Sequence, residues 1–510
     1  MIDRRTVLAL TAWMATGGAR HPGSRTPRST DFNIVHDDET DNTAALHAMS
    51  AELAKQNIRE LIWAKGIVRC RRPFIVPDRL RIVSDDDFSG IRNVAEGPDN
   101  IRSPLLIGNW HPAFLAHQGA AFGSDVGGGG RLALLPTHAG VDAAADRITL
   151  ADPAMAAAIR VGRVHAVIRR EYDVQSSTGV ALQIPLASSL VRVVAADSRT
   201  GVVQFDAPIG FTSPGSIALV SIDAAMHDPF GLPVGFADNV SIEGLKTFGF
   251  TSIGNVCASS FECSFREMGG EVVTPIMVNS LTRSVIDGWR GTFTGARAVE
   301  IKFSHHEGVI RNIDLKHRPI DGQRYEGAMF SVGEYCRDLT VDTFNVDARQ
   351  WNQGILFQLQ PGQNCTFRNG RVSAPLARKD PVTLYADPFV PLRRSGLDKV
   401  TIRHGSNVHI YIAEGRHEAE QCFVRNCTFS TSYEGPVIAV AIRGGRECQV
   451  TGNAFDRGAM ELSGFSSRGN LLRENITDSS TVRGVGIAQN RVGRNYIRGG
   501  GGTRIAFGSD

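Results

Sequence analysis

Cys422-Phe423-Val424-Arg425-Asn426 is one of nine related stretches that recur along the second half of this 510-residue chain. Each stretch has an apolar anchor at its centre, within a short alternation of inward and outward positions. Two positions after the anchor, six of the nine have Gly or Asn, which tolerate the left-handed backbone conformation of a sharp bend. The nine anchors are Ile242, Phe265, Ile286, Ile310, Val341, Phe367, Ile402, Val424 and Val450.

The spacing of the anchors predicts a solenoid. From Ile242 to Val450 the eight intervals cover 208 residues, a mean of 26, and periods of this size indicate stacked supersecondary units. No ten-residue helical pattern recurs between anchors, which excludes helical repeats and leucine-rich horseshoes. Short strands joined by left-handed bends predict a right-handed parallel β-helix, an all-β fold. At a strand spacing of about 4.8 Å, nine coils extend about 45 Å, enough for several sugar units.

Four of the eight cysteines stand two positions before an anchor: Cys263, Cys365, Cys422 and Cys448. A shared inward column predicts that they stack as small apolar core residues. A disulfide between Cys422 and Cys448 is the alternative. The spacing Cys-x-x-Cys is absent, which argues against a zinc site.

A helix signal follows an acidic stretch near the N-terminus. Residues 37 to 62 begin Asp37-Asp38-Glu39-Thr40-Asp41, and Leu46, Met49, Leu53 and Ile58 form an apolar stripe. The order Thr-Asp-Asn-Thr-Ala-Ala-Leu, helix, glycine turn, strand and proline resembles the start of pectate-lyase-like proteins and phage tailspikes. The resemblance covers about 45 residues, and it implies that the helix caps one end of a β-helix. The Gly-Asp-Gly usual in those families is replaced here by residues 36 to 39.

Composition and charge exclude several classes. With 55 Lys and Arg against 52 Asp and Glu, the net charge of +3 does not suit a nucleic-acid binder driven by counterion release. No apolar run approaches the roughly 20 residues of a membrane span. Arg4-Arg5 precedes a short apolar stretch and then small residues, which resembles a bacterial twin-arginine signal and predicts a periplasmic or secreted protein.

Alternating segments between Arg147 and Phe205 predict a β-rich insert before the repeats. The expected domain organisation is a signal peptide at 1–19, a linker at 20–36, the N-terminal cap and first strands at 37–100, the β-rich insert at 101–236, the parallel β-helix coils at 237–498 and a C-terminal tail at 499–510.

The densest polar cluster lies between residues 300 and 326. Strand alternation puts Val299 and Ile301 inside and therefore predicts that Glu300 and Lys302 point outward. Repeat lengths of 31 residues here and 35 residues from Phe367 to Ile402 indicate insertions, which in solenoids gather on a binding face. The second insertion contains Arg378-Lys379-Asp380.

These residue types suit β-elimination of a uronate-containing polysaccharide. Such a lyase neutralises the substrate carboxylate, removes the C5 proton and protonates the leaving oxygen. The predicted catalytic residues are Lys302, His305, His306, Arg311 and Tyr325. The predicted substrate-binding residues are Arg318, Arg324, Trp351, His409 and Tyr411.

Glu300-Ile301-Lys302-Phe303-Ser304 resembles the stretch of chondroitinase- and alginate-lyase-type β-helices that carries a calcium-binding Glu and a catalytic Lys. The resemblance implies a possible Ca²⁺ ligand at Glu300 and a base at Lys302. In that family Arg-His-Gly follows one coil later, whereas here Arg403-His404-Gly405 follows 101 residues after Lys302, in the expected bend position.

Three other functions stay open from the sequence. A glycoside hydrolase needs two carboxylates about 5 to 9.5 Å apart, and Asp321 with Glu326 or Glu334 is such a candidate pair. A non-catalytic glycan-binding or surface protein would use the same scaffold. A C5-epimerase shares the proton chemistry of the lyase.

Overall fold

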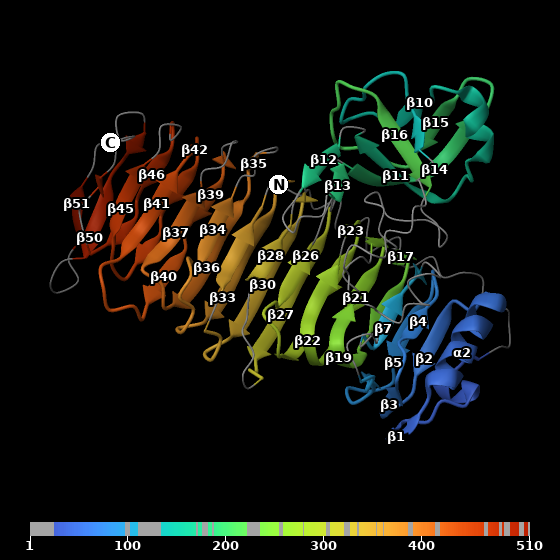
Figure 1. Cartoon of the computed structure of the whole chain (residues 1–510). Coiled ribbons are helices and arrows are strands. Elements are labelled where there is room, and N and C mark those ends of the chain that lie inside the picture. The colour runs from blue at the N-terminus through green and yellow to red at the C-terminus, as the bar shows by residue number, and fades with distance from the viewer. Residues whose placement is uncertain are drawn as a thin grey trace.

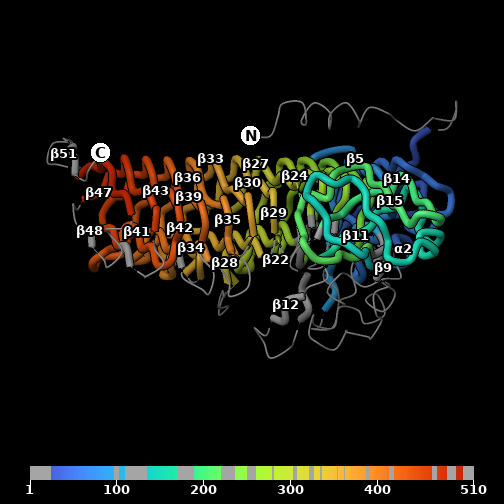
Figure 2. The backbone as a smooth tube through the Cα atoms, turned by 90° about the horizontal axis from the view of Figure 1, so that it is seen from above, coloured from blue at the N-terminus to red at the C-terminus, as the bar shows by residue number. Residues whose placement is uncertain are grey.

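The computed structural model describes residues 25–96, 103–110, 134–169, 172–175, 182–185, 188–221, 235–253, 259–278, 280–301, 307–320, 327–333, 336–352, 354–360, 362–385, 391–413, 419–463, 468–478, 482–483, 490–498 and 504–507. The chain folds into the predicted right-handed parallel β-helix, with a cap at its N-terminal end and a β-rich insert beside the early coils (Figure 1). Seen from above, the coils follow one another as a single spiral from the cap to the C-terminal end (Figure 2).

Each coil contributes strands to three main ladders. The first ladder carries the anchors and contains β2 (Glu60–Trp63), β5 (Arg81–Ser84), β18 (Ser241–Glu243), β21 (Ser264–Arg266), β24 (Val285–Asp287), the start of β27 (Val309–His317), β30 (Thr340–Asp347), β33 (Thr366–Ser373) and β36 (Gly396–His404), then β39 (Phe423–Arg425), β43 (Gln449–Thr451), β46 (Leu471–Arg473) and β49 (Arg491–Val492).

The second ladder follows the bend after each anchor strand. It contains β1 (Asp37–Asp41), β3 (Ile67–Cys70), β6 (Gly90–Asn93), β19 (Lys246–Ile253), β22 (Gly269–Val278), β25 (Arg290–Phe293), the second halves of β27, β30, β33 and β36, then β40 (Thr428–Thr431), β44 (Ala454–Phe455), β47 (Ile476–Thr477) and β50 (Asn495–Arg498), with β51 (Arg504–Phe507) antiparallel to β50.

The third ladder completes the cross-section. It contains the end of β22, β26 (Val299–Ile301), β28 (Ala328–Val332), β31 (Ile355–Leu359), β34 (Val382–Tyr385), β37 (Val408–Ala413), β41 (Ile438–Arg443), β45 (Ala459–Ser463) and β48 (Val482–Arg483). Shorter strands lead back to the first ladder: β8 (Asn109–Trp110), β17 (Gly235–Asp238), β20 (Ser259–Phe261) and β23 (Ser280–Thr282), and then β29 (Cys336–Arg337), β32 (Gly362–Gln363), β35 (Leu392–Arg393), β38 (Ala419–Glu420) and β42 (Gly445–Arg446).

Left-handed residues flank the anchor strands on both sides. The predicted Gly and Asn positions two after the anchor all have positive φ: Gly244, Gly288, Asn312, Asn369, Asn426 and Gly452. A second left-handed column lies three positions before the anchors and is formed by Asn239, Glu262, Arg283, Glu307, Asp338, Asn364, Arg394, Gln421, Glu447 and Gly469. The second column carries charged residues that have no intrinsic preference for this conformation, so sequence reasoning missed it.

One anchor was assigned wrongly from the sequence. Phe367 pairs with Leu397, and Leu397 pairs with Val424, whereas Ile402 pairs with Val372 in the second ladder. The left-handed residue of this coil is accordingly Lys399, not His404. Two apolar positions five residues apart both satisfied the local pattern, and only the stacking of neighbouring coils distinguishes them.

The inner column before the anchors changes its chemistry toward the C-terminal end. Cys263, Cys365, Cys422 and Cys448 are buried free cysteines, as predicted, and burial raises the pKa of each of the first three thiols. The column then continues with asparagines: Asn470 Oδ1 accepts from the Cys448 amide at 2.8 Å. Because each amide side chain bonds the next coil, the column becomes a hydrogen-bonded ladder.

A second asparagine ladder lies at the opposite bend. Asn453, Asn475 and Asn495 are buried, and the amide N–H of each of the first two donates to the side-chain oxygen of the next, at 3.1 and 3.0 Å. The side-chain amide of Asn475 also donates to Val450 O at 2.8 Å. Stacked amides of this kind satisfy buried polar groups in successive strands.

The N-terminal cap closes the first coil. Helix α2 (Thr43–Lys55) buries Leu46, Met49 and Leu53 against it, which confirms three of the four residues of the predicted apolar stripe. The helix is shorter than predicted: it ends at Lys55, so Ile58 lies beyond it, partly buried against the same core. Residues from Arg28 onward also pack here: η1 (Ser29–Phe32) follows, and Ser29 is buried with its Oγ accepting from the Ala64 amide at 3.0 Å.

The chain leaves the coils after β7 (Leu105–Ile107), which pairs with β4 (Phe74–Val76), and returns at β17. β5 and β6 pair directly with β18 and β19, so the early coils are continuous across the insertion. The insert is an antiparallel sheet with its own core, and it contains β9 (Leu134–Pro136), β10 (Arg147–Thr149), η3 (Pro153–Ala158), β11 (Val164–Arg169), β14 (Ser188–Asp197), β15 (Val202–Phe205) and β16 (Ile217–Ser221), with the hairpin β12 (Tyr172–Gln175) and β13 (Leu182–Pro185).

Buried charges attach the insert to the coils. Arg192 of the insert pairs with Asp238 at 2.9 Å and Glu262 at 2.7 Å. In the reverse direction, Arg337 of β29 donates to Ile209 O at 3.0 Å and to Ser189 Oγ at 2.8 Å. Removing one partner of such a buried network leaves an uncompensated charge, so the contact holds the insert in one position.

Candidate functional site

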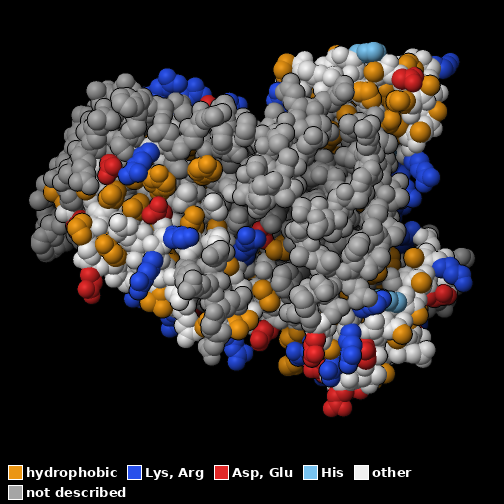
Figure 3. Space-filling view, viewed as in Figure 1, with side chains coloured by type: hydrophobic (Ala, Val, Ile, Leu, Met, Phe, Trp, Pro, Cys, Tyr) orange, Lys and Arg blue, Asp and Glu red, His pale blue; other side chains and the backbone are white. Residues whose placement is uncertain are grey.

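Outward charges on the first ladder are paired between coils. Arg311 pairs with Asp287 at 2.7 Å, and the neighbouring Asn312 donates to the same carboxylate at 2.6 Å. The same arrangement recurs where Arg368 and Asn369 bind Asp342, and where Arg425 and Asn426 bind Asp398. Figure 3 shows the face seen in Figure 1, on which blue and red side chains are scattered among hydrophobic and neutral ones. The first ladder is therefore a compensated surface, and Arg311 has a partner within the coil stack.

Cationic side chains instead accumulate at the corner that joins the second and third ladders. We define this basic corner as Lys316, Arg318, Arg349, Arg378 and Lys379. It is occupied by three successive coils, because Lys316 pairs in register with Asp347 and Asp347 with Ser373. Part of the charge is compensated: Arg349 pairs with Asp347 at 2.6 Å and Arg318 with Glu271 at 3.5 Å.

Two cavities open along the basic corner. One of about 660 Å³ is lined by Lys316, Arg318 and Arg349, together with Thr292, His317, Asp347 and Gln350. The next, of about 480 Å³, is lined by Arg378 and Lys379 with Asn352, Gly354 and Leu376. Five cations against one carboxylate in the two linings give the corner a clear preference for anionic ligands.

His317 lines the first cavity from the interior side. Its ring lies 4.9 Å from that of Phe293, and only 4% of the residue is exposed. Burial lowers the pKa of His317 to about 4, although a backbone hydrogen bond at Gly295 acts in the opposite direction. The imidazole is therefore neutral at ordinary pH and adds no charge to the basic corner.

A second polar group lies on the third ladder. Arg443 lies 5.6 Å from the ring centre of Tyr411 and 3.7 Å from the carboxylate of Glu461. Burial raises the pKa of Asp380, and the positive charge of Arg443 acts against that rise. Asp380 directly follows Lys379, so this third-ladder cluster of Asp380, Tyr411, Arg443 and Glu461 adjoins the basic corner.

The structure describes some of the predicted site residues and not others. Lys302, His305, His306, Arg324 and Tyr325 lie outside the described residues, as do the candidate carboxylates Asp321, Glu326 and Glu334. Arg318 is 69% exposed and lines a cavity, and Tyr411 is half-buried beside Arg443. The structure thus brings Arg318 into the basic corner and Tyr411 into the third-ladder cluster.

Glu300 alternates outward between the core residues Val299 and Ile301, as predicted, but it is covered rather than open to solvent. Glu300 is 2% exposed and forms an ion pair with Arg297, three residues earlier. Within the described part of the chain, no group of three or more His, Cys, Asp and Glu side chains is placed to hold a metal ion. Because Arg297 already supplies the counter-charge, the described residues do not form the calcium site implied by the resemblance.

Trp351 and His409 were predicted to bind substrate, and the structure corrects both predictions. Each is 0% exposed, as is Trp289, so none of these rings can stack on a sugar. Trp351 lies at the corner where the chain turns inward between the second and third ladders. His409 packs against Phe429 and Phe455, with ring centres 5.6 and 5.4 Å apart.

His409 belongs to a buried hydrogen-bonded chain with His404. His404 Nε2 and His409 Nδ1 are 2.7 Å apart, and His409 Nε2 lies 3.0 Å from Arg457 O and 3.3 Å from Asp456 Oδ1. His404 Nδ1 accepts from the Ser406 amide at 3.0 Å, so His404 donates to His409 through Nε2. Burial lowers the pKa of His404 to about 3. The Arg403-His404-Gly405 motif thus places its histidine in the core.

Sequence analysis did not predict that Lys316, Arg349, Arg378 and Lys379 form one group of cations. The repeat lengths indicated the two insertions. The choice of Ile402 instead of Leu397 as the anchor shifted the predicted end of the second repeat by five residues. No helix among the described residues is long and apolar enough to cross a membrane.

No protein-family model and no curated protein matches the sequence. Among solved structures, the tailspike gp61 of Pseudomonas phage phi297 is similar, with a TM-score of 0.52 and 11% identity over 93% of this chain and 84% of that chain. The tailspike gp49 of Pseudomonas phage LKA1 gives a TM-score of 0.46 at 12% identity, over 93% and 76% of the two chains. An exopolygalacturonase of Thermotoga maritima gives 0.37 at 10% identity, over 100% and 99%. The likeness to the phi297 tailspike confirms the β-helix fold.

Proposed function

We propose that this protein is an exported, carbohydrate-active β-helix protein that binds an acidic polysaccharide at the basic corner and cleaves it by β-elimination. The observation that supports this most is the group of five cations around two cavities on successive coils. Extended polymers suit a surface that repeats from coil to coil, and a shallow cationic one suits carboxylated sugars.

The corner supplies the first requirement of the reaction. A cation such as Lys316 or Arg318 against the substrate carboxylate stabilises the negative charge that develops when the C5 proton leaves. Proton transfer is assigned to Lys302, His305, His306 and Tyr325, by residue type. Residues 302–306 directly follow β26 in the chain. Tyr325 lies seven positions after Arg318, which belongs to the basic corner.

A second candidate is a glycoside hydrolase. It is favoured by the third-ladder cluster, in which burial raises the pKa of Asp380 while Glu461 is ion-paired with Arg443. Two carboxyl groups whose environments differ in this way suit the acid and base roles of glycoside cleavage.

A panel of acidic polysaccharides distinguishes these functions. The lyase is expected to produce an unsaturated product that absorbs near the ultraviolet edge. New reducing ends without that absorbance would indicate hydrolysis, a changed uronate composition without cleavage would indicate a C5-epimerase, and binding without turnover would indicate a surface or adhesion protein.

Variants separate the two catalytic assignments. Lys302→Ala, His305→Ala and His306→Ala are expected to lower turnover while leaving binding intact, and Asp380→Asn serves as the matched control. If all three left a detected activity unchanged and Asp380→Asn removed it, the lyase assignment would be overturned in favour of the hydrolase.

A further inference from the structure

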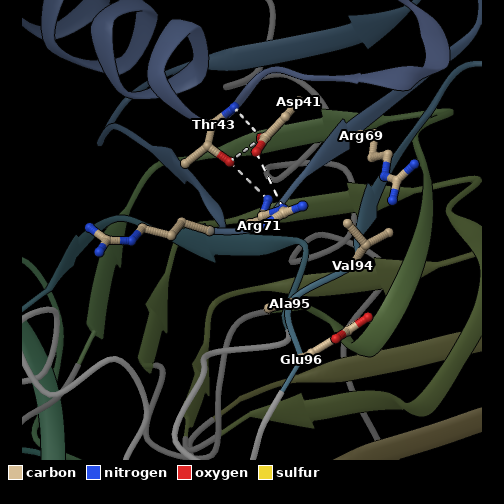
Figure 4. A pocket seen from close by; sticks show the side chains of 8 residues that line it. Asp41, Thr43, Arg69, Arg71, Val94, Ala95 and Glu96 are labelled. Carbon is tan, nitrogen blue, oxygen red and sulfur yellow. Dashed lines mark hydrogen bonds and ion pairs between the residues drawn. The ribbon is translucent and has the colours of Figure 1, made fainter.

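A third cavity lined by cations lies at the N-terminal end of the β-helix. It has a volume of about 450 Å³, and three arginines line it: Arg69 at the end of β3, and Arg71 and Arg72 in the turn that follows. Figure 4 shows Arg71 beside Asp41 and Thr43, with Arg69 across the cavity and Glu96 at its lower edge. We define the N-terminal station as Arg69, Arg71 and Arg72.

Two carboxylates, Asp41 and Glu96, share the lining with these arginines, and Asp41 is already engaged. Asp41 accepts from the amide and the hydroxyl of Thr43 at 3.0 and 2.6 Å, and it lies 3.5 Å from Arg71. These bonds tie the Asp41 carboxylate to the start of α2. Arg69 and Arg72 form no ion pair within the part of the chain that the structure describes. Two guanidinium groups therefore remain available to an anion.

The register of the second ladder connects this cavity with the basic corner. Arg69 pairs with Arg92, Arg92 with Phe248, Phe248 with Glu271, Glu271 with Thr292 and Thr292 with Lys316. Arg69 and Lys316 therefore occupy the same outward column, five rungs apart. At a strand spacing of about 4.8 Å, this separation is about 24 Å.

Within this column, the positions between the two cavities carry little free positive charge. Arg92 is paired with Asp38 at 2.9 Å and lies over Phe248, and Glu271 is paired with Arg318. Thr292 is neutral. A chain lying along this column would thus meet cations at both ends and a compensated surface between them.

We propose that the N-terminal station binds anionic groups of the same polysaccharide chain that occupies the basic corner, and this rests on the proposed function. Two sites on one rigid scaffold convert the second contact into an intramolecular one, so affinity rises once a chain is long enough to reach both. Guanidinium groups suit the planar carboxylate of a uronate because they bind it with two parallel hydrogen bonds.

The test compares chain lengths on the full protein. Oligogalacturonates, from a disaccharide to chains that extend beyond about 24 Å, are titrated by calorimetry against the wild type and Arg69→Gln/Arg72→Gln. The double variant Arg147→Gln/Arg199→Gln is the matched control, because it removes the same charge from side chains that are 68% and 90% exposed on the insert.

The wild type and the control are expected to show a step in affinity as the chain spans both sites. The Arg69→Gln/Arg72→Gln variant is expected to lose about tenfold or more for long chains and nothing for short ones. Equal affinity of long chains for this variant and the wild type would overturn the station while leaving the basic corner intact.

Two further outcomes separate the station from the proposed function. If no acidic oligosaccharide of any length bound the wild type, both proposals would fail together. If inorganic phosphate bound the wild type but not Arg69→Gln/Arg72→Gln, and long chains showed no step in affinity, the cavity would be an independent oxyanion site and the shared-chain proposal would be overturned.

Discussion

The guanidinium of Arg311 pairs with the carboxylate of Asp287, one coil earlier, at 2.7 Å. Asn312 donates to the same carboxylate, and the pattern of Arg and Asn against Asp repeats in two later coils. Each such contact joins two coils on the outside of the first ladder. A residue predicted to take part in catalysis therefore has a position that also serves the stacking of coils.

Replacing Arg311 by Ala is expected to lower the free energy of unfolding by about 0.5 to 1 kcal/mol, since the pair is partly exposed. A double-mutant cycle with Asp287→Ala, measured by chemical denaturation, should show a coupling of that size. Loss of turnover in Arg311→Ala with no coupling to Asp287 would instead assign the side chain to the reaction.

The buried asparagine ladder is expected to be more important for stability. Asn475→Ala leaves the amide of Asn453 and the carbonyl of Val450 without the partner that the Asn475 side chain supplies, at a cost of about 1 to 3 kcal/mol. Thermal unfolding measures the loss, and the exposed Asn345→Ala provides the control. An equal effect of both substitutions would contradict the role of the ladder.

Trp351→Ala is expected to destabilise the fold by about 3 to 5 kcal/mol, because a fully buried aromatic side chain leaves a cavity. The affinity of the folded fraction of Trp351→Ala for polysaccharide should stay within about twofold of that of the wild type. A selective loss of binding at unchanged stability would restore the sugar-stacking prediction that the burial of this ring contradicts.

Acid is expected to destabilise the protein through His317 and His404. Burial lowers their pKa values to about 4 and about 3, whereas an unfolded histidine has an ordinary pKa near 6.5. The unfolded chain therefore binds more protons in this window, so stability falls as pH drops below about 6.5. The loss is complete below the folded pKa values and amounts to about 3 kcal/mol for His317 and about 5 kcal/mol for His404. Unfolding midpoints measured across this range in His317→Leu should show a shallower slope than the wild type.

Binding at the basic corner is expected to depend on salt. Lys316→Gln should weaken polysaccharide binding and reduce the slope of affinity against salt concentration by about one, as expected for the loss of one contact with an anionic group. Arg371→Gln, an exposed arginine on the second ladder outside the two cavities, is the matched control. A salt slope that is the same in all three proteins would exclude the corner as the binding surface.

The sequence by itself determined the type of fold. Gly or Asn two positions after six of the nine anchors indicated the bends, and alternating apolar residues indicated the strands, because both signals are local and recur along the coils. The same patterns predicted the buried cysteines and the apolar face of α2. The export signal at Arg4 and Arg5 and the predicted proton-transfer residues Lys302, His305, His306 and Tyr325 stay predictions, since they lie outside the described residues.

Only the tertiary structure decided which distant residues share a surface. Leu397 rather than Ile402 stacks on Phe367 because neighbouring coils select one of two equivalent local registers. The pairing of β30 with β33 places Arg378 and Lys379 one coil after Arg349, and five rungs of the second ladder align Arg69 with Lys316. His409 and Trp351 are buried because the neighbouring coils cover them. Strand alternation within one coil does not reveal this cover, so the sequence did not predict their burial.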